Sequence, residues 1–395
     1  MEKEKVAPQI DFTNTELAFQ AMSNAKLNRT YWMFRLIDNP FLTKVGPKML
    51  TWAFQMGLPV KGVVKNTIFE LFVGGESLTD TVRTSEYLKK FGVRTIMDYS
   101  VEGEKNEPGY EVTQQEILRT IDHGHAHEEV AFSALKMTGL ARFSLMEKLH
   151  LDKPLTTSET EEWERVITRL QVIAEAASAK QTPVFVDAEE TWIQAPIDRL
   201  VEELMEKYNQ TAPIVWQTIQ LYRWDRLAYL KKLIQDSKEK GYILAVKLVR
   251  GAYLEKESRR AEEMGYQDPM QPSKEATDKD YNEALKLCID NIAHVAICAG
   301  THNEESSLYL TKLMQQKGLE PQDTRVWFAQ LLGMSDNISF NLAHAGYNVA
   351  KYLPYGPVKA VMPYLMRRAE ENTSIAGQSS REVRLLSEEV QRRKL

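Results

Sequence analysis

Cysteine, net charge and long apolar runs are all scarce in this sequence of 395 residues. The two cysteines, Cys288 and Cys298, are too few for a disulfide framework and lie outside any metal-spaced motif, so a reducing compartment is the simplest expectation. The formal net charge is −5 with both signs mixed, and no basic field exists to attract nucleic acid. No run reaches the ~18 apolar residues that a membrane-spanning helix needs.

The N-terminal residues also lack the apolar core of a secretory signal, because residues 1–12 read MEKEKVAPQIDF. We therefore expect a cytoplasmic protein, and peripheral attachment to the inner face of the cytoplasmic membrane remains open.

Residues 1–90 have helical apolar spacing interrupted by proline and glycine, which predicts several short helices. This aromatic segment is either a cap on the main domain or a surface for a membrane or a lipid-soluble partner. The sequence gives no oligomeric state.

From about residue 91 to residue 380, short β-rich runs alternate with amphipathic helical runs. The expected strands are residues 94–100, 130–137, 183–190, 214–222, 243–253, 294–303, 326–332 and 348–356. Alternating strands and helices require parallel pairing, and eight such units close into a (β/α)8 barrel, a TIM-like α/β fold. The rival, an open doubly wound sheet, usually has a glycine-rich first turn, and no GxGxxG motif is present. Residues 381–395 are expected to form a charged C-terminal helix or tail.

Positive side chains gather where the expected strands end, which is where such barrels place their chemistry. These residues are Lys136, Lys247 and Arg250, followed by the tandem Arg367 and Arg368 on a late helix. Each of these residues taken alone could be an ordinary solvent-exposed side chain at the rim of the barrel. Together they indicate an anionic ligand, because a buried cluster of cations is costly and guanidinium groups match carboxylate or phosphate.

Other chemistry remains open on the same residues. Lys136 or Lys247 could form a Schiff base in a lyase. His123, His125 and His127 alternate as in some metal hydrolases, but they fall on a helix end outside the barrel, where protonated histidine would meet the helix C-terminus favourably. We expect no metal site. A non-catalytic helical scaffold is the remaining alternative.

Several segments resemble the proline dehydrogenase family in the correct order along the chain. They are MDYSVEG, LKMTGLARFSLMEKL, FVDAEETW, KLVRGAYLEKE, THN, FAQLLGM and YLPYGPVKAVMPYLMRRAEEN. The resemblance extends into the N-terminal segment and is closest to the short monofunctional form. It implies a distorted (β/α)8 barrel that binds FAD and oxidises L-proline to Δ1-pyrroline-5-carboxylate, by hydride transfer to flavin N5. Electrons would pass to membrane quinone. Hydroxyproline dehydrogenase of the same family is the alternative.

The resemblance also implies a role for individual residues. Substrate contacts are implied for Lys136, Tyr253, Leu331, Tyr352, Arg367 and Arg368. Contacts with FAD are implied for Gln220, Lys247, Arg250, Gly251, Ala252, Thr301 and His302. Asp187 and Lys247 would be catalytic, with Asp187 ordering the cations, and Glu102 would pair with Arg367 as a gate. Lys247 stands where many bacterial members have arginine, which keeps the charge but loses the forked donor geometry.

Overall fold

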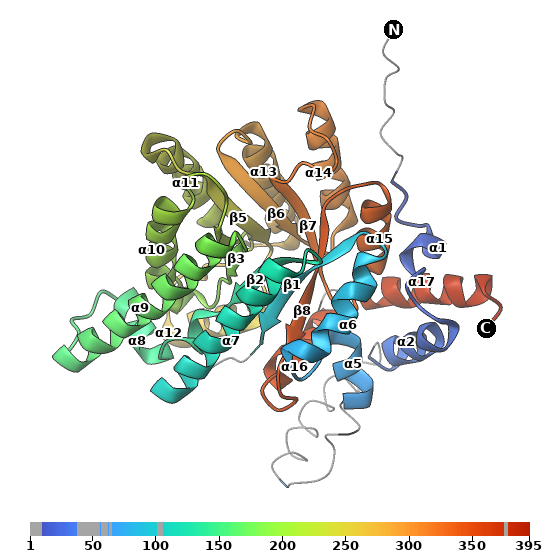
Figure 1. The fold of residues 1–395 in the computed structure, drawn as a ribbon, viewed down its shortest axis with the longest axis horizontal. Helices are drawn as coiled ribbons and strands as arrows, with labels where there is room; N and C mark the ends of the chain where they lie inside the picture. The colour runs from blue at the N-terminus through green and yellow to red at the C-terminus, as the bar shows by residue number, and fades with distance from the viewer. Residues whose placement is uncertain (1–9, 38–55, 57–61, 63–64, 101–105, 375–377) are drawn as a thin grey trace.

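The computed structural model describes residues 10–37, 56, 62, 65–100, 106–374 and 378–395. Eight parallel strands close into a barrel in sequence order, and β1 pairs with β8 (Figure 1). The strands are β1 Val93–Tyr99, β2 Val130–Leu135, β3 Val184–Val186, β4 Val215–Gln220, β5 Leu244–Val249, β6 Val295–Gly300, β7 Val326–Leu331 and β8 Val349–Tyr355. The predicted barrel and each of its predicted strands are confirmed.

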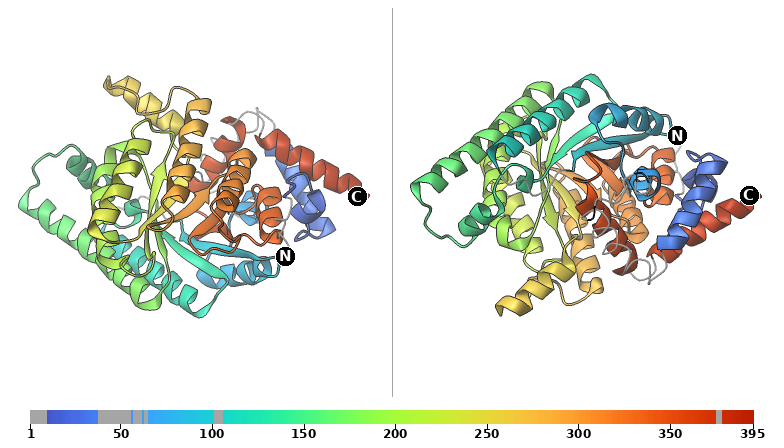
Figure 2. Two further views of the ribbon diagram at one scale, coloured as in Figure 1. Left: turned by 90° about the horizontal axis from the view of Figure 1, so that it is seen from above. Right: turned by 90° about the horizontal axis from the view of Figure 1, so that it is seen from below.

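Helices surround the barrel on all sides (Figure 2). Those that lie between or beside the strands are α6 Leu78–Lys89, α7 Glu107–Ala126, α8 Phe143–His150, α9 Thr157–Lys180, α10 Thr191–Tyr208, α11 Arg226–Lys240, α12 Leu254–Met264, α13 Lys274–Asp290, α14 Glu304–Gln316, α15 Asp336–His344 and α16 Met362–Ser374. Polar caps begin several of them: Ser77 and Thr156 form capping boxes, and Asn106, Ser273 and Asn303 each accept a backbone N–H.

Strand residues alternate between the inside of the barrel and the surrounding helices. Aromatic rings fill part of the interior: the Phe132 and Phe185 rings stack 4.4 Å apart, and the Trp216 ring meets Phe132 edge-on at 5.3 Å. The interior is therefore a packed core rather than a channel. By the same alternation Asp98, Thr218, Lys247 and Tyr352 lie on the inner face, nearer the carboxyl ends of their strands.

A second apolar core lies beside the barrel and joins distant parts of the chain. Helices α1 Thr15–Ala18 and α2 Asn24–Ile37 pack with α17 Gln378–Arg392, and the blue N-terminal helices adjoin the red C-terminal helix in Figures 1 and 2. Arg393 strengthens this contact by donating to the carbonyl oxygens of Met22, at 2.7 Å, and Phe19, at 2.8 Å. The predicted boundaries at residues 90 and 380 stay predictions.

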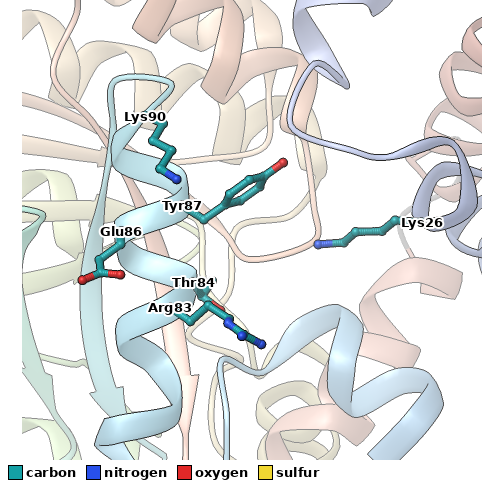
Figure 3. A pocket seen from close by; sticks show the side chains of 6 residues that line it. All are labelled: Lys26, Arg83, Thr84, Glu86, Tyr87 and Lys90. Atoms are coloured by element: carbon teal, nitrogen blue, oxygen red, sulfur yellow. The ribbon is translucent and has the colours of Figure 1, made fainter.

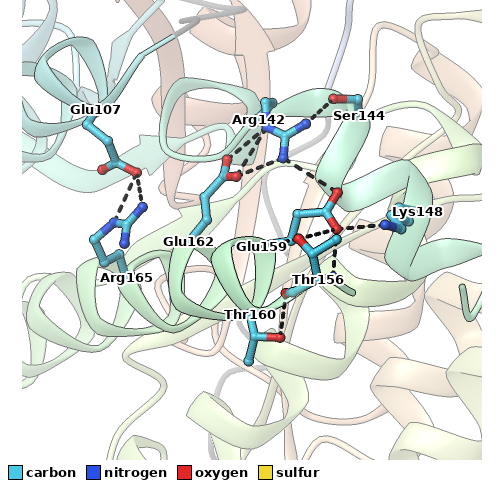
Figure 4. A network of polar contacts seen from close by, with 9 residues as sticks. All are labelled: Glu107, Arg142, Ser144, Lys148, Thr156, Glu159, Thr160, Glu162 and Arg165. Atoms are coloured by element: carbon cyan, nitrogen blue, oxygen red, sulfur yellow. Dashed lines mark hydrogen bonds and ion pairs between the residues drawn. The ribbon is translucent and has the colours of Figure 1, made fainter. Parts of the chain in front are cut away.

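An ionic network holds α8 against α9, just after β2 (Figure 4). The Arg142 guanidinium lies 2.7 Å from a Glu162 oxygen, and Lys148 Nζ lies 2.6 Å from Glu159. The hydrogen bond from Lys148 and that from the Thr156 backbone lower the pKa of Glu159 to about 2.

Among the helices in the described ranges, none is long and apolar enough to cross a membrane.

Candidate active site

Asp187 is the centre of a buried polar cluster at the carboxyl ends of the strands. It follows β3 and accepts hydrogen bonds from Lys247 Nζ on β5 and from the Tyr352 hydroxyl on β8, the latter at 2.6 Å. Lys136, which follows β2, places its Nζ 3.2 Å from the same carboxylate. Barrel closure therefore brings together residues that lie more than a hundred positions apart in the sequence.

The electrostatics of this cluster favour one ionised carboxylate. Burial alone would raise the pKa of Asp187, but Lys247, then Lys136, and the hydrogen bonds from Lys247 and Tyr352 outweigh it and lower the pKa to about 2. Burial, and then the nearby Asp187 charge, raise the pKa of Tyr352 well above its usual value. At neutral pH a neutral phenol thus donates to an ionised carboxylate.

Asp98 adds a second buried carboxylate, for which the sequence reasoning assigned no role. Its side chain is fully buried on β1 and lies 3.3 Å from Lys136 Nζ. Lys136 and Lys247 therefore face Asp98 and Asp187, so their charges are largely balanced within the protein. The predicted excess of positive charge at the mouth depends on the arginines of α16 instead.

Helix α16 brings Arg367 and Arg368 to this end of the barrel. The Arg367 guanidinium lies 5.7 Å from the centre of the Tyr253 ring, which begins α12 after β5. Arg368 is only 5% exposed and lies 5.1 Å from the Tyr364 ring on its own helix. Neighbouring helical residues point about 100° apart, so the two arginines contact different aromatic rings, Tyr253 and Tyr364. Glu102, the predicted partner of Arg367, lies outside the described residues.

Arg250 follows β5 and joins neighbouring segments at this end of the barrel, including the one that follows β6. It donates to Thr301 Oγ1 at 2.7 Å and to Asp278 at 2.7 Å, and it lies 4.3 Å from the Tyr281 ring. The next residue, Gly251, has φ +139°, and a Cβ there would overlap the Tyr222 ring. Glycine is therefore required for the backbone to pass this ring.

The remaining predicted residues flank the same mouth. Gln220 is buried at the end of β4, Leu331 ends β7, and Ala252 is exposed in the segment after β5. His302 follows β6, and its Nδ1 lies 2.9 Å from Ser335 Oγ. Burial, then Lys351, Arg368 and Arg250, lower the pKa of His302 to about 3. The imidazole is therefore neutral at physiological pH.

The alternating histidines lie elsewhere, at the end of α7 outside the barrel. The His123 and His127 rings stack 4.1 Å apart, and His125 Nδ1 lies 2.8 Å from the Lys180 carbonyl oxygen. Burial, and then His127, lower the pKa of His123, which disfavours the expected protonated form at that position. Within the described ranges, no three histidine, cysteine, aspartate or glutamate side chains gather as a metal site would require.

A surface cavity of about 390 Å³ lies away from this cluster (Figure 3). Its lining belongs to α2 or to α6 with its C-cap, and consists of Lys26, Arg83, Thr84, Glu86, Tyr87 and Lys90. The Tyr87 hydroxyl already donates to the Ala21 carbonyl at 2.5 Å. The cavity therefore lies between α2 and α6, and none of the predicted site residues lines it.

Two features of the mouth are chemically compatible with a bound cofactor that carries phosphate: a buried hydroxyl without a partner and nearby cations. Thr218 is 6% exposed on the inner face, paired in register with Lys247, and its hydroxyl finds no hydrogen-bond partner among the described residues. A buried hydroxyl in that state is costly unless a ligand meets it. Arg250 presents a guanidinium suited to phosphate, and Lys247 presents an ammonium beside Thr218. The sequence reasoning missed Thr218, because threonine is also an ordinary strand former.

The fold and the site together define a (β/α)8 barrel protein with a buried cluster of acidic, basic and tyrosine side chains at the carboxyl ends of its strands. The family model for proline dehydrogenase matches residues 81–381. The chain is 32% identical over 333 residues to a carbapenem antibiotics biosynthesis protein, CarD, of Pectobacterium carotovorum, covering 84% of this chain and 86% of that one. It is 32% identical to hydroxyproline dehydrogenase of Bos taurus, covering 96% of this chain and 92% of that protein.

A solved structure has the same fold. Proline utilization A from Bdellovibrio bacteriovorus superposes with a TM-score of 0.72 at 20% identity, and covers 92% of this chain and 38% of that longer one. The chain belongs to the proline dehydrogenase family, and is thus an oxidoreductase of that family. The predicted family is confirmed.

Proposed function

We propose that this chain binds FAD and oxidises L-proline to Δ1-pyrroline-5-carboxylate. The observation that carries the proposal is the buried cluster of Asp187, Lys136, Lys247 and Tyr352 beneath the arginines of α16. FAD, when bound, supplies the acceptor for the hydride that leaves the ring carbon next to nitrogen. Gln220, Lys247, Arg250, Gly251, Ala252, Thr301 and His302 would hold it.

The chain's own residues would bind and orient the substrate. Arg367 and Arg368 would grip the carboxylate with paired guanidinium forks, because planar donors match its two oxygens. Tyr253, Leu331 and Tyr352 would enclose the pyrrolidine ring and exclude water. The same positive charges disfavour an ammonium and lower the pKa of the substrate amine. The amine would lose its proton to water, which leaves the nitrogen lone pair free to assist hydride loss.

Colour is the direct test of this proposal. The purified protein should be yellow, and its flavin absorbance should bleach when L-proline is added without oxygen. Arg368→Met should raise KM for proline while FAD stays bound, with exposed Arg384→Met as the matched control. Equal loss of flavin and activity in Arg368→Met would assign the arginine pair to the cofactor instead, and a colourless protein that binds no added FAD would refute the proposal.

Hydroxyproline is the second candidate substrate, because a hydroxyproline dehydrogenase is among the relatives that align over almost the whole chain. Tyr352 limits ring substituents, since its hydroxyl is fixed on Asp187 at 2.6 Å. Tyr352→Ser should shift the ratio of kcat/KM values toward hydroxyproline. An unchanged ratio would show that Tyr352 does not set this preference.

We also propose membrane quinone as the electron acceptor, reached by peripheral attachment. The exposed Trp32 and Leu36 on α2, 55% and 58% exposed, support a membrane-facing role for the N-terminal segment. Reduction of a short-chain quinone with proline as donor, and loss of liposome binding in Trp32→Ser, would test this proposal.

A further inference from the structure

A buried polar relay connects α17 to the barrel mouth. Glu382 on α17 is 6% exposed and accepts a hydrogen bond from the Ser335 backbone N–H at 2.6 Å. Ser335 is 4% exposed, and its hydroxyl lies 2.9 Å from His302 Nδ1. Three elements distant in sequence thus meet through two hydrogen bonds.

Ser335 holds a conformation that needs outside support. Its φ of 50° and ψ of 45° lie in the left-handed region, which a residue with a Cβ rarely adopts. The Glu382 carboxylate satisfies the N–H that this conformation exposes at the start of α15. Without that acceptor the buried N–H of Ser335 would be left unpaired. The left-handed conformation of the turn would then lose a hydrogen bond that stabilises it.

The turn around Ser335 is fixed from other sides as well. Lys351 on β8 lies 2.7 Å from Asp336 and donates to the Met334 carbonyl oxygen at 2.5 Å. Arg381, beside Glu382 on α17, forms an ion pair with Glu304 on α14. Lys351 thus anchors the turn from β8, and a hydrogen bond made to this turn can fix the ring of His302.

We propose that Glu382 is a positioning residue, which acts through Ser335 to fix the imidazole of His302 at the cofactor site. This inference rests on the proposed function, in which His302 contacts FAD. Because Ser335 engages Nδ1, Nε2 is the ring nitrogen of His302 that would meet the cofactor. Helix α17 is then part of the catalytic apparatus rather than a separate tail.

Burial, and then the nearby charge of Asp336, raise the pKa of Glu382 to about 7, whereas the Ser335 N–H, Lys351 and Arg381 act in the opposite direction. The relay needs only an acceptor oxygen, which glutamate keeps in either protonation state. Glu382→Gln retains that oxygen and should preserve the relay, whereas Glu382→Ala removes it.

The experiment measures FAD affinity by fluorescence titration of the apoprotein. Glu382→Ala and Ser335→Ala should each weaken FAD binding by roughly 5- to 30-fold, the range for one lost buried hydrogen bond. The double variant should be no weaker than either single one, and Glu382→Gln should stay near wild type. The matched control is Glu388→Ala on the same helix, where the glutamate is exposed and pairs with Arg384.

Nitrogen NMR of the His302 ring in the apoprotein tests the relay without FAD. The tautomer ratio should change in Ser335→Ala and Glu382→Ala, but not in Glu388→Ala. A folded Glu382→Ala protein with unchanged ring shifts and unchanged FAD affinity would overturn the inference. If that alanine variant does not fold, Ser335→Ala alone decides in the same way. Failure of the wild-type protein to bind FAD would instead refute the proposed function. The NMR shifts of the His302 ring would still show whether Glu382 and Ser335 fix its orientation.

Discussion

Replacing Asp187 with asparagine removes the negative charge that faces Lys247 and Lys136 inside the barrel. The pKa of Asp187 falls from its ordinary 3.8 to about 2, which corresponds to roughly 2 kcal/mol of stability at neutral pH. Breaking a buried ion pair by removing one partner costs about 3–5 kcal/mol, because the other charge stays buried. We therefore expect Asp187→Asn to lower the free energy of unfolding by about 3 kcal/mol.

The assay is thermal unfolding of the apoprotein, followed by circular dichroism. Unfolding entropy scales with chain length, so about 3 kcal/mol in a chain of 395 residues lowers Tm by roughly 4 °C. Asp290→Asn is the matched control, since its pair with Lys286 is exposed to water and should change Tm little.

The pH dependence gives a sharper test of the same reasoning. A carboxylate with a lowered pKa stabilises the fold above its unfolded pKa, and this stability is lost as pH falls through the folded value. The difference between wild type and Asp187→Asn should therefore be full above about pH 4 and shrink between pH 4 and 2. Equal stability of the two proteins at pH 7, or a difference independent of pH in that window, would refute the electrostatic account.

Three further predictions concern the mouth of the barrel. Gly251→Ala should lower the free energy of unfolding by about 1–3 kcal/mol, because of its φ of +139° and the Tyr222 ring, and a Tm equal to wild type would contradict this. Thr218→Val removes a buried hydroxyl that has no partner, so it should raise the free energy of unfolding of the apoprotein by about 1 kcal/mol. The same change should weaken FAD binding, and tighter binding would contradict this expectation. The His302 ring should be neutral at pH 5 by NMR, and a protonated ring there would show that burial does not govern it.

The barrel was predictable because buried parallel strands read as short apolar runs. Residues 295–300 and 326–331 are examples, and the helices α9 and α11 have clear apolar spacing. The helices α12 and α15 were not predicted. The sequence of α12, LEKESRRAEEM, has seven charged residues among eleven, and α15 is short and begins after a serine in a left-handed conformation.

The parts of the site that follow from barrel topology could be predicted from the sequence. The parts that depend on the register of individual strands could not. Lys136, Asp187, Lys247 and Tyr352 meet because the carboxyl ends of all barrel strands lie at one face. The role of Asp98 was missed, since deciding which acid near β1 faces inward requires the strand register. The relay through Glu382 joins residues far apart in sequence, and no local pattern reports such a contact.

The contact between α17 and the first helices has a consequence for synthesis on the ribosome. Arg393 donates to the carbonyl of Phe19, so the partner of this early segment is translated more than 370 residues later. At bacterial and eukaryotic elongation rates that delay is roughly 20 to 75 s. During this interval the apolar side of α2 has no α17 to cover it, so this surface is exposed to water until synthesis is almost finished.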